Sequence, residues 1–90
     1  MDLKIGSCYR TIQTSPMSYN KDKYFEATFD NGDIFTVVDY ETRIKPDWRP
    51  VTNQTQHIWT VLHGSRMAYI HAQEGSRLHL EIYRFFQLII

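Results

Sequence analysis

The sequence is short of several features that would point to a functional class. It holds one cysteine, Cys8, in 90 residues, which excludes an intrachain disulfide and a cysteine-based zinc site. Ten basic and ten acidic side chains give a formal charge of zero. Proteins held to nucleic acid or membrane by bulk electrostatics usually carry an excess of Lys and Arg, so that class is disfavoured.

No apolar run approaches the ~20 residues that span a bilayer, so we expect no membrane association. The first residues, Met1 to Lys4, also lack the charged and then apolar segments of a signal peptide. Together with the single cysteine, these absences predict a reducing, intracellular setting, with the protein in the cytoplasm.

Alanine and leucine are scarce, at three and five residues, whereas nine isoleucines, eight threonines and 13 aromatic residues are present. β-branched and aromatic side chains fit a pleated, half-buried sheet, while helical domains rely on Ala and Leu. A chain of this length is expected to form one compact domain, residues 1–90. The fold class is therefore predicted to be all-β or β-dominated.

Asn31-Gly32 separates two β-rich runs, 24–30 and 33–40, and this dipeptide favours a type I′ hairpin turn. That register places Phe29 opposite Ile34 on an apolar face, which we predict to be core. Residues 4–13 are predicted to form an earlier strand, and residues 14–22, which include Pro16, a loop.

A second hairpin is predicted around Gly64-Ser65, between residues 57–63 and 66–72, with a further turn at Glu74-Gly75. Tight turns at both corners place one nearly apolar set on a shared face. We predict as core Ile58, Thr60, Leu62, Met67, Tyr69, His71, Leu78, Leu80 and Ile82. Trp59 and Val61 fall on the opposite, outer face.

Residues 41–56 are predicted to be a long loop bracketed by Pro46 and Pro50, because proline is poorly compatible with helices and central strands. The C-terminal part fits either a strand to about Tyr83, which we favour, or a short helix with Ser76 as N-cap. The predicted fold is a small five- to six-stranded antiparallel barrel or curled sheet built from hairpins, with the short C-terminal helix as an alternative.

Two sets of residues are candidates for contact with a partner protein. Trp48 and Arg49 lie in the proline-bracketed loop, and Trp and Arg dominate interface hot spots. Tyr24, Phe35 and Val37 form a second candidate patch on the outer face of the first hairpin. In each case the alternative is burial, with Trp48 as a plug over the sheet. The aliphatic tail, residues 85–90, must be covered, and homo-oligomer formation is one way to cover it.

A third set suggests a different ligand. The predicted outer face of the second hairpin and its neighbour combines ring and cationic side chains: His57, Trp59, Arg66, Arg77, His79 and Tyr83. Such mixtures hold nucleotides and single-stranded nucleic acids. The alternative is an ordinary polar outer face whose rings pack on neighbours.

Catalytic, metal and cofactor sites are not expected. His57 and His63 lie about 20 Å apart along an extended strand at ~3.3 Å per residue, too far to share a metal ion. No acid, base and nucleophile converge in the predicted register. The sequence therefore favours a non-enzymatic small protein-binding module or inhibitor, of the kind common in phage and mobile elements, that occupies a partner surface. Nucleotide or single-stranded nucleic-acid binding is the alternative.

Overall fold

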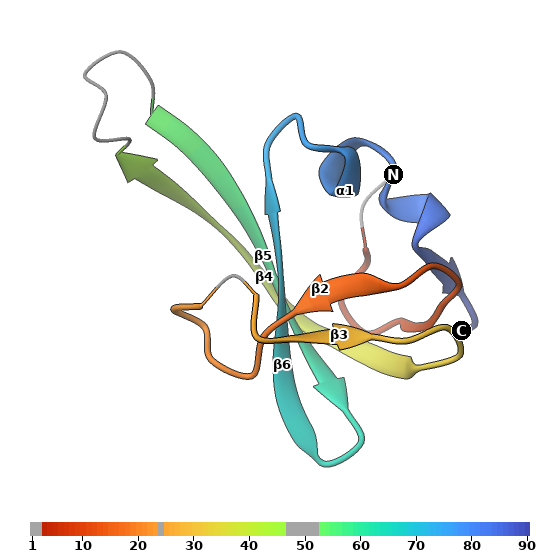
Figure 1. Cartoon of the computed structure of the whole chain (residues 1–90). Helices are drawn as coiled ribbons and strands as arrows, with labels where there is room; N and C mark the ends of the chain where they lie inside the picture. The colour runs from red at the N-terminus through yellow and green to blue at the C-terminus, as the bar shows by residue number, and fades with distance from the viewer. Residues whose placement is uncertain (1–2, 24, 47–52) are drawn as a thin grey trace.

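The structure, a computed structural model, describes residues 3–23, 25–46 and 53–90 (Figure 1). Its elements are β1 (Cys8–Thr11), β2 (Ser15–Met17), β3 (Ala27–Phe29), β4 (Ile34–Pro46), β5 (Asn53–His63), β6 (Arg66–Gln73), helix α1 (Arg77–Leu80), 3-10 helix η1 (Ile82–Arg84) and β7 (Phe86–Leu88). A five-stranded antiparallel sheet has the order β6-β5-β4-β1-β7, and β2 pairs with β3 in a second sheet. The predicted β-dominated curled sheet is confirmed, although the two sheets do not join into a closed barrel across the described strands.

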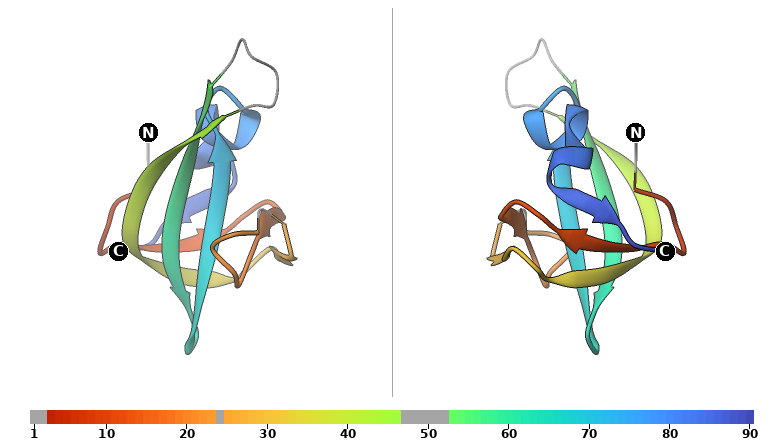
Figure 2. Two further views of the ribbon diagram at one scale, coloured as in Figure 1. Left: turned by 90° about the vertical axis from the view of Figure 1, so that its left-hand side faces the viewer. Right: turned by 90° about the vertical axis from the view of Figure 1, so that its right-hand side faces the viewer.

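The core lies on the concave side of the larger sheet. Figure 2 shows this sheet curving, with β2 and the helices α1 and η1 on one side of it. The rings of Phe29 and Phe35 stack there with centroids 5.0 Å apart, and Phe86 packs edge-on against Phe35 at 5.1 Å. Offset and edge-to-face ring pairs stabilise a core beyond their buried area, so these rings join β3, β4 and β7.

At the Asn31-Gly32 turn, Gly32 has a positive φ of 99° but Asn31 does not, so the turn is not the predicted type I′, and the hairpin predicted around it is absent. The strands on its two sides enter different sheets, because β3 pairs with β2 and β4 pairs with β1 and β5. The Gly32 N–H instead donates to the Thr11 carbonyl at 2.7 Å, which holds the turn against β1. The predicted pairing of Phe29 with Ile34 is therefore wrong.

The second hairpin has the predicted register, since His63 lies opposite Arg66 and Leu62 opposite Met67. The face that packs into the main core is the opposite of the predicted one. Trp59 and Val61 are fully buried, whereas Leu62 and Met67 are 40% and 45% exposed. The register prediction is confirmed. The core prediction is wrong for Leu62, Met67 and Leu80, whereas Ile58, Thr60, His71 and Ile82 are buried as predicted.

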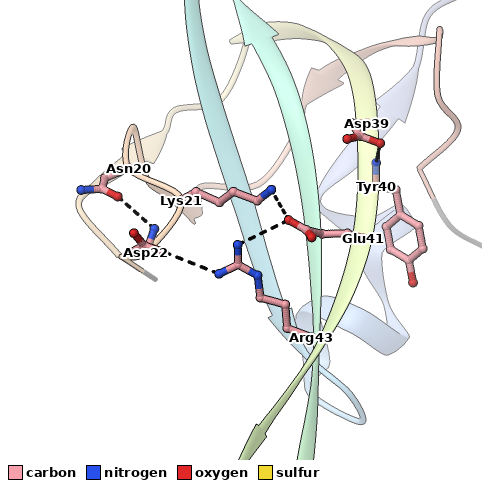
Figure 3. Close-up of polar contacts among 7 residues, drawn as sticks. All are labelled: Asn20, Lys21, Asp22, Asp39, Tyr40, Glu41 and Arg43. Carbon is pink, nitrogen blue, oxygen red and sulfur yellow. Dashed lines mark hydrogen bonds and ion pairs between the residues drawn. The ribbon is translucent and has the colours of Figure 1, made fainter.

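Both faces of β5 are buried at its centre, because a loop covers the outer face there. An ionic cluster holds the loop after β2 against β4 (Figure 3). Lys21 pairs with the Glu41 carboxylate, and Arg43 lies 3.7 Å from Glu41 and 3.5 Å from Asp22. Glu41 is the cross-strand neighbour of Ile58, which is 1% exposed. The cluster therefore lies over the outer face of the sheet beside Ile58.

A β-bulge at Val38 decides which side chains of β4 face the core. Val37 lies opposite Val61 and Asp39 opposite Thr60, so Val38 has no residue opposite it. The extra residue reverses the alternation of faces beyond it. Tyr40, and not Asp39, consequently lies opposite Trp59 on the core side.

Residues 41–56 are mostly strand, which corrects the predicted long loop. β4 continues to Pro46 and β5 begins at Asn53, and these two residues lie opposite each other. β6 pairs with β5 only as far as Gln56, so the far parts of β4 and β5 run as a two-stranded ribbon away from the body (Figure 1). Pro46 fits because it ends its strand and has no third strand beside it.

The N-terminal and C-terminal segments also differ from the prediction. β1 covers only four of the residues predicted as strand, and β2, with Pro16, lies in the predicted loop. Proline fits β2 because this strand is short and Pro16 pairs only with Thr28 of β3. The favoured strand to Tyr83 is wrong, and the helical alternative is confirmed, with the Ser76 hydroxyl accepting from the His79 N–H as an N-cap. None of the helices in the described parts of the chain could cross a membrane.

Candidate binding surface

The structure does not support the predicted protein-binding patch. Phe35 and Val37 are 1% and 0% exposed and belong to the core, because the face of β4 predicted to be outer is the buried one. Trp48, Arg49 and Tyr24 lie outside the described residues. Sequence reasoning failed for Phe35 and Val37 because it paired β4 with β3, whose partner is β2.

The residues of the predicted nucleotide site do not share an exposed face. Trp59 is fully buried and His57 is 8% exposed, so neither ring offers a stacking surface to a base. Arg66 begins β6 and Arg77 follows its end, which separates them by more than about 20 Å at ~3.3 Å per residue. Of the aromatic residues in this set, only Tyr83 is well exposed, at 53%.

The arginines of this set also have partners within the protein. The Arg66 guanidinium lies 3.6 Å from the centre of the Tyr19 ring, a cation–π contact. Arg77 pairs with Glu81 at 3.2 Å. Both side chains are therefore engaged away from Trp59.

His57 is the centre of a cluster that sequence reasoning missed. Its Nδ1 lies 2.6 Å from the Tyr40 hydroxyl, and its Nε2 lies 3.5 Å from the Glu74 carboxylate. The His79 ring of α1 stacks on it at 4.1 Å between centroids, with the ring planes 14° apart. Because His57 is almost fully buried and the ring of His79 stacks on it, we assign the cluster the structural role of holding α1 against the sheet.

No group of three or more metal-ligating side chains occurs among the residues that the structure describes. Two other regions of the surface are candidates for binding. One is the edge strand β7 with the pocket beside it, and the other is a group of exposed apolar side chains on the outer face of the sheet.

An open apolar pocket of about 440 Å³ lies beside β7, within the size range of ligand sites. Its lining comes from the N-terminal segment, β1, η1 and β7: Leu3, Lys4, Tyr9, Ile12, Ile82, Tyr83, Phe86, Gln87 and Leu88. Tyr9, Ile82 and Phe86 are buried, whereas Tyr83 and Leu88 are more than half exposed. The pocket is therefore lined by core side chains and bordered by exposed apolar ones.

β7 is an edge strand, with β1 on one side and no strand on the other among the described elements. The Ile12 N–H donates to the Phe85 carbonyl at 2.8 Å, and the Ile89 N–H donates to the Cys8 carbonyl at 2.9 Å. Backbone groups alternate in direction along an antiparallel strand. Phe86 and Leu88 therefore direct their N–H and C=O groups away from β1.

Cationic side chains surround this edge. Lys4 lines the pocket, Arg10 lies opposite Gln87 of β7, and Arg77 and Arg84 share the Glu81 carboxylate. Lys4 and Arg10 have no ion pair among the described residues. A side-chain hydrogen bond to Tyr83 and the negative charge of Glu81 raise the pKa of the Arg84 guanidinium. At the β7 edge, Glu81 therefore pairs with two of these four cationic groups, Arg77 and Arg84.

A second exposed apolar patch lies on the outer face of the sheet. Leu62 lies opposite Met67 on one side and Thr36 on the other, and Ile34 and Val38 of β4 are 50% and 40% exposed. Met67 lies on β6, the other edge strand of the sheet, which backbone hydrogen bonds between Ser18 and Tyr69 cover in part. The β7 edge differs in having an apolar pocket beside it.

One feature of the sequence indicated the surface around β7. It is the aliphatic tail, residues 85–90, which we expected to be covered. Leu88, Ile89 and Ile90 are 56%, 40% and 82% exposed.

Searches of family models, curated proteins and solved structures give no match to this chain.

Proposed function

We propose that this protein is a non-enzymatic protein-binding module that acts by occupying a partner surface, and that the partner contacts the β7 edge and its pocket. The observation that carries the proposal is the open apolar pocket directly beside an unpaired strand edge. An inhibitory role follows if the covered partner surface is a functional one. The proposal includes a cytoplasmic setting, which the single free cysteine, Cys8, favours.

Physical reasons support this choice of surface. An exposed strand edge carries unpaired N–H and C=O groups that readily pair with another chain, and proteins usually cover or blunt such edges. Contiguous exposed apolar side chains also mark interaction sites. Tyr83 and Leu88 border the pocket, so a partner that pairs with β7 would bury apolar surface at the same time.

Nucleotide or single-stranded nucleic-acid binding has less support. It requires stacking rings and phosphate-binding cations on one exposed face. Trp59 is buried, and Arg66 and Arg77 lie at opposite ends of β6.

Capture of partners from the source cells tests the proposal, with tagged wild-type protein, Leu88→Asp and a control, Ile44→Asp. Leu88 and Ile44 are both exposed strand residues, at 56% and 68%, but Ile44 lies on the distant ribbon. We expect wild type and Ile44→Asp to retain the same protein after nuclease treatment and at high salt. Leu88→Asp should lose it, because a carboxylate would be desolvated at the interface.

Two results would contradict the proposal. Retention that depends on nucleic acid, falls steeply with salt and disappears in the Arg66→Ala/Arg77→Ala variant would favour the alternative. Undiminished retention by folded Leu88→Asp would exclude the β7 edge as the contact site.

A further inference from the structure

We propose that the β7 edge binds an extended partner segment in which apolar and acidic residues alternate. This inference rests on the proposed function and specifies the occupant of that site. It follows from the backbone of β7, the two faces of the sheet beside it, and the charges around it.

The backbone of β7 can accept an added strand. β7 is extended over Phe86–Leu88 and has one side open, and hydrogen bonds between Cys8 and the residues Ile89 and Ile90 continue the contact with β1. Phe85, the C-cap of η1, has a helical backbone and precedes the strand. Three residues span about 10 Å at ~3.3 Å per residue, the short end of the usual strand length. A peptide added at such an edge gains main-chain hydrogen bonds, and its alternate side chains provide specificity.

The two faces of the sheet next to β7 differ in chemistry. Leu88 lies opposite Tyr9, and both line the apolar pocket. Gln87 lies opposite Arg10. Gln87 also borders the pocket, whereas Arg10 is exposed and is not part of the pocket lining. Directly opposed residues share a face, so an added strand would direct alternate side chains to the pocket and to the side of Arg10.

The positive charges near β7 favour acidic residues among the partner side chains that would point to the side of Arg10. Neighbouring strands lie ~4.8 Å apart, so an added strand would run about 10 Å from β1. The long side chain of Arg10 and a glutamate can meet across that distance. Lys4 at the pocket and Arg84 of η1 add to the positive potential. Of these three cations, only Arg84 has a carboxylate partner among the described residues, Glu81. Acidic residues on the partner are therefore favoured.

The same charges argue against a second copy of this chain as the occupant. Pairing β7 with β7 of another molecule would bring Lys4, Arg10 and Arg84 of one molecule toward those of the other. Like charges at an interface are unfavourable. A partner of opposite charge fits this edge better than self-association does.

Three blocked peptides test the inference: four Glu-Val repeats, four Lys-Val repeats, and four glutamates followed by four valines. Each is titrated into the full-length protein and followed by amide NMR. We expect the Glu-Val repeat to bind at least tenfold more tightly than either other peptide. Amide exchange at Phe86 and Leu88, whose N–H groups point outward, should slow on binding.

Charge-reversed variants provide the matched comparison. The Lys4→Glu/Arg10→Glu variant should bind the Glu-Val repeat at least tenfold more weakly and should gain affinity for the Lys-Val repeat. Arg66→Glu, at the far end of β6, should bind the Glu-Val repeat as wild type does. This outcome would locate the preference for acidic residues at β7.

Equal affinity for the three peptides would overturn the inference, as would amide shifts centred on Leu62 and Met67. Protection of Phe86 and Leu88 in the protein alone, together with dimer formation, would identify a second copy as the occupant and overturn it as well. If no peptide binds while Leu88→Asp still abolishes partner capture, the inference fails and the proposed function stands. If the Glu-Val repeat binds but Leu88→Asp captures the same partner as wild type, the proposed function fails.

Discussion

At the scale of single residues, burial separates the aromatic side chains that hold the fold from those open to a partner. Trp59 is fully buried, with the Tyr40 ring 5.3 Å away, and its Nε1 has no hydrogen-bond partner in the described structure. Tyr83 is 53% exposed and lines the pocket. The sequence pattern placed both rings on one outer face for two reasons. The face of β5 that carries Ile58 and Leu62 was taken as core, and strand alternation was continued past Glu74-Gly75 into residues that form η1.

Replacing Trp59 by Ala should lower the free energy of unfolding by about 3–5 kcal/mol, the range for truncating a buried aromatic side chain. Trp59→Phe should cost less, since the indole N–H makes no hydrogen bond that would be lost. Tyr83→Ala should change stability by less than about 1 kcal/mol. Urea denaturation measures all three, and a wild-type midpoint for Trp59→Ala would show that Trp59 is not in the core.

His79→Ala should loosen α1, because the His79 ring stacks on His57. Ring pairs of this kind contribute about 0.5–1.5 kcal/mol. We expect faster amide exchange at Leu80 and Glu81, whose N–H groups donate to the Ser76 and Arg77 carbonyls. Leu80→Ala is the control, since Leu80 is 62% exposed on the same helix. Unchanged amide exchange at Leu80 and Glu81 in His79→Ala would show that the His57 cluster does not stabilise α1.

At the scale of elements, turn chemistry predicted the strand pairing correctly at Gly64-Ser65 and incorrectly at Asn31-Gly32. Gly64-Ser65 has the expected register because Gly64, with φ of 64°, allows a tight turn. The buried face could not be read from the pattern, since Trp59 and Val61 alternate with the equally apolar Ile58 and Leu62. The Val38 bulge and the entry of β3 into a second sheet depend on long-range contacts, which a local pattern does not contain.

Amide exchange should distinguish the strands of the ribbon from the loop that the sequence predicted. Residues 57–62 of β5 have β4 on one side and β6 on the other, so their amides should exchange most slowly. Hydrogen-bonded amides in residues 42–46 and 53–55 should be protected to a lesser degree, because they have one neighbouring strand. Exchange at the rate of an unstructured peptide in these segments would contradict the extended β4–β5 pairing.

At the scale of the whole molecule, the formal charge is zero, but cationic side chains are concentrated around the β7 edge. Lys4, Arg10, Arg77 and Arg84 gather around β7. In the described structure Glu81 pairs with Arg77 and Arg84, and not with Lys4 or Arg10. The sequence predicted an association surface in the tail, but it did not predict the pocket. That pocket joins residues 3–12 to residues 82–88, and only the folded chain brings these segments together.

The cationic edge should keep the protein monomeric at low salt, because two β7 edges repel each other, and salt should weaken this repulsion. Sedimentation equilibrium at low and high salt measures the effect. A stable dimer at low salt that Leu88→Asp dissociates would show that two copies pair through β7.

Site-specific photo-cross-linking in the source cells tests the proposed contact site most directly. A benzophenone amino acid replaces Leu88 in one variant and Ile44 in another, both exposed positions. The β7 site predicts a discrete, nuclease-resistant protein adduct from position 88 and none from position 44. An adduct from position 44 alone, or a nucleic-acid adduct from position 88, would contradict it.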